Sequence, residues 1–316
     1  MTKSEDQKNK IATVISSNIG EGEKIDEIAK IRGWFRPQEN SIYYPTIQKY
    51  VEDEIDMETV TSTLFSPIDE KIAAQKLDDV NFLDLWYSVL HAARRKTFHP
   101  VQANGKTHEH FHAKVVDIVG AFRAHTLPAP HDAYNYLYES LTDFSLACRE
   151  AYNDAPEAAH ASQVEIDAWA NLNFFYARVT EAGLLDLSIH AIWSMRAALE
   201  NEAHDDDEGT AAQKYNVLVP AAAAWVFGLR RALWHKEVDL TPSDRKQGNP
   251  ARGGELWKGT AGFSKERWAL WKERLAVISK MDDVSDETRY ISRDALEAME
   301  RAESTSKGMH SAKAGV

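Results

Sequence analysis

Apolar side chains recur along this chain at the spacing of an α-helix. Phe82, Trp86 and Val89 are four and three residues apart, and segments 163–182 and 264–281 carry aromatic and aliphatic residues at the same steps. This spacing places the apolar residues on one face of a helix, which can then be buried. Strict alternation of apolar and polar residues next to hairpin turns is missing from the sequence. We therefore predict an all-α protein without a significant sheet.

The same pattern predicts one compact domain of about ten helices. Segments rich in turn residues separate the helices, and HPVQANGK, LPAPHD and NDAPEA are the clearest of these. Twelve spans are candidates, and the shortest of them do not count as separate helices in that total: 5–18, 22–34, 44–56, 68–75, 78–96, 107–124, 132–152, 163–182, 184–203, 211–237, 264–281 and 285–303.

Three segments differ from this helical pattern. The polar N-terminus, residues 1–10, and the small, polar tail, residues 304–316, are predicted to be disordered. The helical domain then covers residues 11–303. Within it, residues 239–262 form a long loop rich in glycine and proline, and loops of this length tend to be lids, binding loops or disordered segments. Trp257 and its neighbour Leu256 give this loop an apolar part that a solvated linker does not need.

Composition narrows the possible partners and the location. The 316 residues include 37 Lys and Arg against 49 Asp and Glu, a formal net charge of −12. Because an acidic chain repels phosphate backbones, we expect no nucleic-acid partner. The single cysteine, Cys148, excludes an intrachain disulfide and fits a reducing compartment.

Membrane insertion and secretion are not expected either. The N-terminal segment MTKSEDQKNK lacks the apolar core of a secretory signal. The most apolar run, Val217–Leu229, is too short for a bilayer core of about 30 Å, and Pro220 interrupts it. The sequence also lacks G-x-G-x-x-G, a P-loop, G-x-S-x-G and C-x-x-C, so we expect no cofactor. The protein is predicted to be cytoplasmic, and its oligomeric state is left open.

One motif points to metal chemistry. His108-Glu109-x-x-His112 matches H-E-x-x-H, the zinc and general-base signature of many metalloproteases. With Thr107 as N-cap, His108 and His112 lie one turn apart at the start of an amphipathic helix, where they could share a metal ion. The position at a helix start, and Ile118 where a third histidine would be needed, argue against a protease. We favour a capped helix start, with a metal site at His108 and His112 as the alternative.

Other polar residues among apolar ones are candidates for ligand binding. Asn173 and Arg178 lie in the aromatic segment WANLNFFYARVT, Trp225 lies in WVFGLRRALWHKE, and Trp257 lies in the long loop. A buried core role is the more ordinary explanation for such residues. The acidic segment Leu199–Gly209, which includes Glu200 and His204, has oxygen ligands for Mg²⁺ or Ca²⁺, but a solvated turn is favoured.

The C-terminal third, GELWKGTAGFSKERWALWKERLAVIS followed by DETRYISRDALEAMERAE, resembles a fungal family known only as domain of unknown function 3632. The upstream segments LDLWYSVLHAARR, WANLNFFYARVTEAG and VPAAAAWVFGLRRAL agree with the family in the same order. The resemblance covers about residues 40–303 and implies a soluble, helical protein of filamentous fungi. It brings no established activity, and H-E-x-x-H is not part of the family pattern.

These observations favour a non-catalytic protein that binds an unknown small molecule or protein. The alternative is a cofactor-independent enzyme of a fungal metabolite pathway that acts on an apolar small molecule. Its pocket would be lined by Asn173, Arg178, Trp225 and Trp257. A zinc-dependent hydrolase acting through His108, Glu109 and His112 is a minor alternative.

Overall fold

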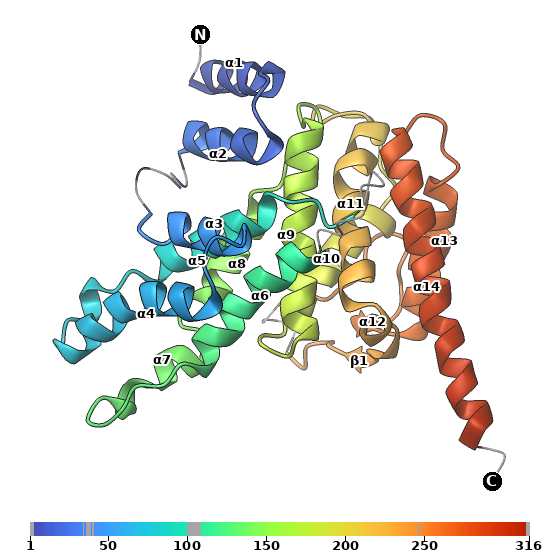
Figure 1. The fold of residues 1–316 in the computed structure, drawn as a ribbon. Helices are drawn as coiled ribbons and strands as arrows, with labels where there is room; N and C mark the ends of the chain where they lie inside the picture. The colour runs from blue at the N-terminus through green and yellow to red at the C-terminus, as the bar shows by residue number, and fades with distance from the viewer. Residues whose placement is uncertain are drawn as a thin grey trace. The chain divides into compact units, whose positions relative to one another are not determined.

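Helices form almost all of the regular structure of this protein (Figure 1). The computed structural model describes residues 3–33, 35, 39, 41–99, 109–244, 246 and 248–313. Within these ranges the only paired strands are two short ones of two residues each. The all-α class predicted from the hydrophobic pattern is confirmed.

The described helices group into two compact units, a division of which the hydrophobic pattern gives no sign. Unit 1 consists of Met1–Ala155 and Ser162–Phe175, and unit 2 of Pro156–Ala161 and Tyr176–Val316. Helix α9 (Gln163–Glu181) contributes to both units. The other elements of unit 1 are α1 (Lys3–Ser16), α2 (Glu21–Arg32), α3 (Tyr44–Val51), α4 (Met57–Ala73), η1 (Leu77–Asp79), α5 (Phe82–Arg94), α6 (Glu109–Ala124), η2 (Asp132–Tyr134), α7 (Tyr136–Glu139) and α8 (Phe144–Asn153).

Aromatic side chains form the centre of unit 1. The ring of Trp86 on α5 packs against Phe122 of α6 and Phe144 of α8, with ring centroids 4.7 and 4.6 Å apart. All three side chains have no exposed surface. The predicted apolar stripe of span 78–96 is therefore the core face of α5. Burial of three rings of this size supplies much of the hydrophobic stabilisation of this unit.

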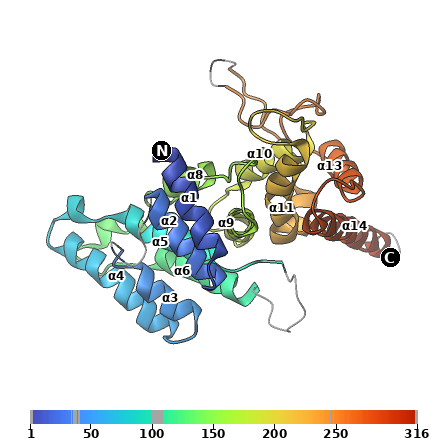
Figure 2. The same ribbon diagram turned by 90° about the horizontal axis from the view of Figure 1, so that it is seen from above.

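Unit 2 is a group of packed helices with a long loop. Its elements are α10 (Ser188–Leu199), α11 (Ala211–Leu229), α12 (Arg231–His235), β1 (Val238–Asp239), β2 (Gly262–Phe263), α13 (Lys265–Ile278) and α14 (Asp286–Lys313). Helix α11 packs against α10 and α14, and α13 lies beside α14 (Figure 2). The buried run Ala221–Ala224 on α11 has small side chains, which let the neighbouring helices approach closely. Strands β1 and β2 pair antiparallel and close the base of the loop predicted at 239–262.

The predicted span 132–152 is wrong as a single helix. The chain instead forms η2, α7 and α8, and Leu141 and Asp143 adopt positive φ angles of 52° and 63° between them. The interruption exposes the Thr142 carbonyl oxygen, which accepts a hydrogen bond of 2.6 Å from Nε1 of Trp86. Because a buried indole N–H needs an acceptor, this tertiary contact accounts for the break.

Two further spans differ from the prediction. Span 211–237 is divided into α11 and α12 at Arg230, whose φ and ψ are 50° and −124°. Span 68–75 is only the end of the longer helix α4, whose N-cap Asp56 accepts a hydrogen bond of 2.8 Å from the Thr59 amide. Pro67 lies inside α4, and a proline in a helical pattern ordinarily indicates an end.

The chain ends also contain helix. Helix α1 begins at Lys3, within the segment 1–10 predicted to be disordered, and α14 continues to Lys313, within the predicted tail 304–316. Residues 1, 2 and 314–316 lie outside the described part of the chain. Disorder of the two ends, like the predicted bounds 11–303 of the helical domain, stays a prediction. Among the described residues, no helix has both the length and the apolar content needed to cross a membrane.

Candidate functional site

Two of the four predicted ligand-binding residues are core residues. Asn173 has no exposed surface, and its Nδ2 donates a hydrogen bond of 3.0 Å to the Trp169 carbonyl oxygen one turn earlier in α9. Trp225, on α11, is also fully buried. Asn173 belongs to unit 1, whereas Trp225 belongs to unit 2. These contacts fit the core role that the sequence favours, and ligand binding by the two residues stays a prediction.

The other two candidates reach the surface of unit 2. Arg178 donates to Glu181 at 2.5 Å within α9 and lies 3.4 Å from the Gly228 carbonyl oxygen. Trp257 is partly exposed, and its Nε1 donates to the Thr260 carbonyl oxygen at 2.9 Å. Trp257 is thus a local support of the long loop. A ligand-binding role for either residue stays a prediction.

The H-E-x-x-H motif falls at the start of α6. Thr107 and His108 lie outside the described residues, and Glu109 is the first residue of the helix. His112 is fully buried, and its Nε2 lies 2.9 Å from the Lys96 carbonyl oxygen. Since a carbonyl oxygen only accepts, Nε2 must carry the proton, and a metal could bind only through Nδ1. The metal-ligand role of His108 and His112 stays a prediction.

Unit 2 contains a buried ion pair that the sequence pattern does not reveal. The prediction of a solvated acidic turn holds for His204 and the acids after it, which are exposed, but it is wrong for Glu200, whose side chain has no exposed surface. Glu200 accepts hydrogen bonds from Nε (2.6 Å) and Nη2 (3.0 Å) of Arg267 and from Nε1 of Trp271 (2.6 Å). A buried carboxylate requires such partners, because its desolvation is otherwise very costly.

Arg267 also fastens the long loop. Its Nη1 donates to the carbonyl oxygens of Ala251 (3.0 Å) and Gly262 (2.7 Å), and its Nη2 to that of Arg252 (3.1 Å). Glu200 accepts a further hydrogen bond of 2.9 Å from the Gly254 amide. We refer to Glu200 and Arg267 with these bonds as the loop clamp. The loop predicted as a lid, binding loop or disordered segment is therefore anchored along residues 251–262.

Glycine is required where the loop meets the clamp. A Cβ on Gly254 would overlap the side chain of Asn201 and the carbonyl of Glu200. At the base of the loop, Gly262 has a φ of 105°, which side chains rarely adopt, and a Cβ there would overlap the Val238 carbonyl oxygen. The two glycines therefore permit close contacts between the loop and the rest of unit 2, which explains why a loop this rich in glycine is nevertheless fixed.

Unit 2 also carries an open groove of about 940 Å³. Helices α12, α13 and α14 form it, and we call it the α13 groove. Its apolar part comes from Trp234, Trp268, Ala269, Ala276 and Leu296, and its polar part from His235, Glu237, Lys265, Lys272, Glu273, Glu300 and Glu303. Pockets that bind ligands typically have about 300–1,000 Å³ and combine apolar walls with a few polar groups. The groove has both properties.

Ion pairs hold the floor of the α13 groove. The Trp268 ring is almost completely buried, and its Nε1 donates to Glu303 on α14 at 2.9 Å. Lys272, one turn later on α13, donates to the same carboxylate at 2.9 Å. The rings of Trp234 and Trp268 lie 5.4 Å apart between centroids, and the Lys265 ammonium lies 3.6 Å above the Trp234 ring. These contacts fix the aromatic surface before any ligand arrives.

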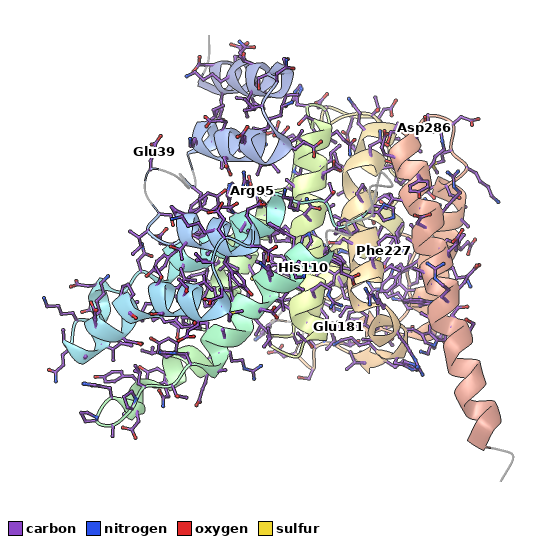
Figure 3. All side chains as sticks on the ribbon, in the orientation of Figure 1. Glu39, Arg95, His110, Glu181, Phe227 and Asp286 are labelled. Carbon is purple, nitrogen blue, oxygen red and sulfur yellow. The ribbon has the colours of Figure 1, made fainter. Side chains whose placement is uncertain are left out.

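Unit 1 contains a second buried polar group, which we call the Asp26 cluster. Asp26 accepts from the Tyr44 hydroxyl at 2.8 Å and lies 2.7 Å from His91 Nε2 and 3.3 Å from Arg95 Nη2. Arg95, at the end of α5 (Figure 3), also donates to the Gly22 carbonyl oxygen at 3.2 Å. Burial lowers the pKa of His91, which favours the neutral imidazole, so Nε2–H donates to the Asp26 carboxylate.

The Asp26 cluster has the residue types of a catalytic dyad but lacks access. Tyr44, His91 and Asp26 are each at most 2% exposed. Burial, and the neighbouring Asp26 charge, also raise the pKa of Tyr44, which keeps its hydroxyl protonated as a donor. These groups stabilise one another in the core, and catalysis in this arrangement would require a substrate to reach a closed site. Within the described residues, no three His, Cys, Asp or Glu side chains converge to hold a metal ion.

The comparison with protein-family models decides the family. Residues 86–275 match the model described as "Protein of unknown function (DUF3632)", which covers more than half of the chain. The chain belongs to the DUF3632 family. Searches of curated proteins and of solved structures each found no match.

The part of the chain that matches the DUF3632 model runs from α5 to α13. It contains both members of the loop clamp, Glu200 and Arg267, and the groove residues of α12 and most of those on α13. Helix α14, which supplies the opposite wall of the groove, lies outside the match. The loop clamp is thus built entirely from segments matched to the family, whereas the α13 groove combines a matched wall with an unmatched one.

Proposed function

We propose that this DUF3632 protein is a non-catalytic binding protein and that the α13 groove is its ligand site. The observation that carries the proposal is the groove of about 940 Å³, in which the half-buried ring of Trp234 is held in place against the buried ring of Trp268. Tryptophan contributes strongly to binding energy, because its large rigid ring loses little conformational entropy. Since the floor is prearranged by ion pairs, a ligand would not have to order it.

The nature of the groove residues supports binding rather than catalysis. The Lys272 ammonium and the Trp268 indole both donate to Glu303, so these groups are engaged in holding the two helices together. A general acid or base must instead meet a substrate atom with its titrating group. The proposal also retains the narrower expectations from the sequence, which are a fungal origin, a cytoplasmic location and a partner other than nucleic acid or membrane.

The cofactor-independent enzyme remains the alternative function. Its predicted pocket residues are divided between the two units, with Asn173 in unit 1 and Arg178, Trp225 and Trp257 in unit 2. The contacts that these side chains make in the structure support the helices and the loop that carry them. We therefore place binding first.

Purification from the native host tests the proposal. Ala269 is an exposed groove residue on α13, and arginine there would fill the groove and keep the helix, because arginine is a good helix former. Ala232→Arg, at an exposed position of α12 that does not line the groove, is the matched control. Mass spectrometry should find a molecule that co-purifies with wild type and Ala232→Arg and is lost from Ala269→Arg. Equal recovery from all three proteins, or from none, would contradict a groove ligand.

A further inference from the structure

The shape of the α13 groove selects among possible ligands. On α13, the lining residues Lys265, Trp268, Lys272 and Ala276 recur at three- and four-residue steps over twelve residues. At about 1.5 Å per residue, this stripe is about 16 Å long. On the opposite wall, Leu296, Glu300 and Glu303 of α14 repeat at the same steps. The groove is therefore a long channel between two helices, which suits an elongated ligand.

The charged residues of the α13 groove also indicate the charge of its ligand. Four glutamates line the groove against two lysines. Both lysines are already engaged, because Lys265 lies over the Trp234 ring and 3.4 Å from Glu237, and Lys272 donates to Glu303. Glu273 and Glu300 are exposed at the rim, and the nearest approach between Glu300 and Lys272 is 4.0 Å. The rim therefore presents negative charge to an approaching molecule, in a chain whose net charge is also negative.

We propose that the α13 groove takes up an amphipathic helix of a partner protein that has basic residues beside its apolar face. The inference rests on the proposed binding function and adds the class of ligand. The apolar face of the helix packs on Trp234, Ala276 and Leu296, and its Lys or Arg side chains lie next to Glu273 and Glu300. Apolar anchors at i, i+3, i+4 and i+7 in a helix of about ten or more residues match a channel of this length.

A pair of synthetic peptides tests this occupant on the full chain. Both are 18 residues long and share one face of Leu and Trp at helical spacing, and the flanking positions are Lys and Arg in one peptide and Glu in the other. Calorimetric titration should show the basic peptide binding about tenfold or more tightly than the acidic one at low salt, with a smaller difference at high salt. Ala269→Arg should weaken the basic peptide about tenfold or more, whereas Ala232→Arg should bind it like wild type.

Reversing the charge of the rim glutamates tests whether they, rather than the apolar floor, select the charge of the peptide. The double variant Glu273→Lys/Glu300→Lys changes exposed residues only, so its fold should be retained, and it should bind the acidic peptide more tightly than the basic one. Equal affinity of wild type for both peptides, or binding that Ala269→Arg leaves unchanged, would overturn the proposal. Self-association of wild type that Ala269→Arg abolishes, measured by sedimentation, would also overturn it, because a second copy would then occupy the groove.

The peptide experiment tests the helical partner, and the purification experiment tests the ligand site, so the two proposals can be contradicted independently. If the peptides do not bind but a small molecule is lost from purified Ala269→Arg, the groove remains a ligand site and the helical partner is wrong. If the peptides do not bind and all three purified proteins give the same molecules, both the ligand site and the helical partner are wrong.

Discussion

Each unit of this protein contains a buried carboxylate, and the two are satisfied in different ways. In unit 1, Asp26 of α2 is held by Tyr44 of α3, by His91 of α5 and by Arg95, which directly follows α5. In unit 2, Glu200 is held by Arg267 and Trp271 of α13 and by the amide of Gly254 in the long loop. Both carboxylates are at most 2% exposed.

The difference lies in the partners. The closest partner of Asp26 is His91, whose imidazole stays neutral in the fold because burial lowers its pKa, but takes up a proton near neutral pH once the chain unfolds. The closest partners of Glu200 are a guanidinium that stays charged and an indole that does not titrate. The Asp26 cluster thus joins helices through a group that responds to pH, whereas the loop clamp joins a loop to two helices through groups that do not. We therefore expect acid to lower stability through the Asp26 cluster, and mutation to lower it more when it removes a member of the loop clamp.

Removing Arg267 should produce the largest effect. Arg267→Met leaves the Glu200 carboxylate buried without its cation, and such a loss typically costs about 3–5 kcal/mol of unfolding free energy. Urea unfolding at pH 7 measures the change. The double variant Glu200→Gln/Arg267→Met should recover most of the loss, because no buried charge then lacks a partner. A single variant within 1 kcal/mol of wild type would show that the loop clamp is not a main support of unit 2.

The corresponding change in unit 1 should be smaller. Asp26→Asn keeps the shape and one oxygen acceptor but removes the charge, so we expect a loss of about 1–3 kcal/mol in the free energy of unfolding. The same urea measurement applies, and Asp117→Asn on the exposed side of α6 is the control that should stay near wild type. A loss as large as that of Arg267→Met would remove the distinction between the two carboxylates.

Replacing Trp257 should loosen the long loop, with a still smaller effect on the free energy of unfolding. Trp257→Phe keeps an aromatic ring but removes the bond from Nε1 to the Thr260 carbonyl oxygen, a change of about 0.5–1.5 kcal/mol. Amide hydrogen exchange should rise in residues 251–262 while exchange in α5 and α6 stays unchanged. Tyr290→Phe on α14 serves as the control outside the loop. Unchanged exchange in the loop would show that the clamp alone holds it.

The smallest effect concerns pH. Burial lowers the pKa of His91 from 6.5, so as the pH falls below about 7 the unfolded chain takes up a proton that the folded chain does not, and stability decreases. His91→Gln retains a donor for Asp26 and should flatten the decrease between about pH 7 and 5. His190→Gln in unit 2 should act in the same direction, because burial also lowers the pKa of His190.

His110→Gln is the matched control for pH. His110 lies on the exposed side of α6 (Figure 3), and its replacement should leave the pH dependence of the unfolding free energy as in wild type. If His91→Gln behaves like His110→Gln, the Asp26 cluster does not respond to acid, and the comparison between the two carboxylates reduces to their mutational sensitivity.

The helices were largely predictable, and their interruptions were not. The apolar stripes predict α5, α9 and α13 correctly, because apolar spacing directly reports a buried helix face. The division of span 132–152 depends on the Thr142 carbonyl meeting the indole of Trp86, 56 residues earlier. The spacing of apolar residues within this span does not depend on so distant a contact, so the break could not be predicted from it.

The candidate site was less predictable than the fold. Trp257 was identified as unusual for a solvated loop, and its place beside the loop clamp agrees with that reasoning. The sequence pattern does not point to Arg267, and it predicts a solvated turn at Glu200, because neither residue belongs to a recognisable motif. A signal was present in the glycines at 253, 254, 259 and 262, since so many glycines near one tryptophan indicate close backbone contacts.

The sequence by itself determined the all-α class, most of the helices and the resemblance to the DUF3632 family, because each of these depends on local spacing and on short motifs. Only the tertiary structure decided that Glu200 is buried, that the long loop is fastened, and that α13 and α14 leave a groove between them. The reason is physical: hydrophobic spacing records which residues avoid water, but not which partners they meet. Glu200 and Arg267 are 67 residues apart, and only the packing of α10 and α13 brings them together.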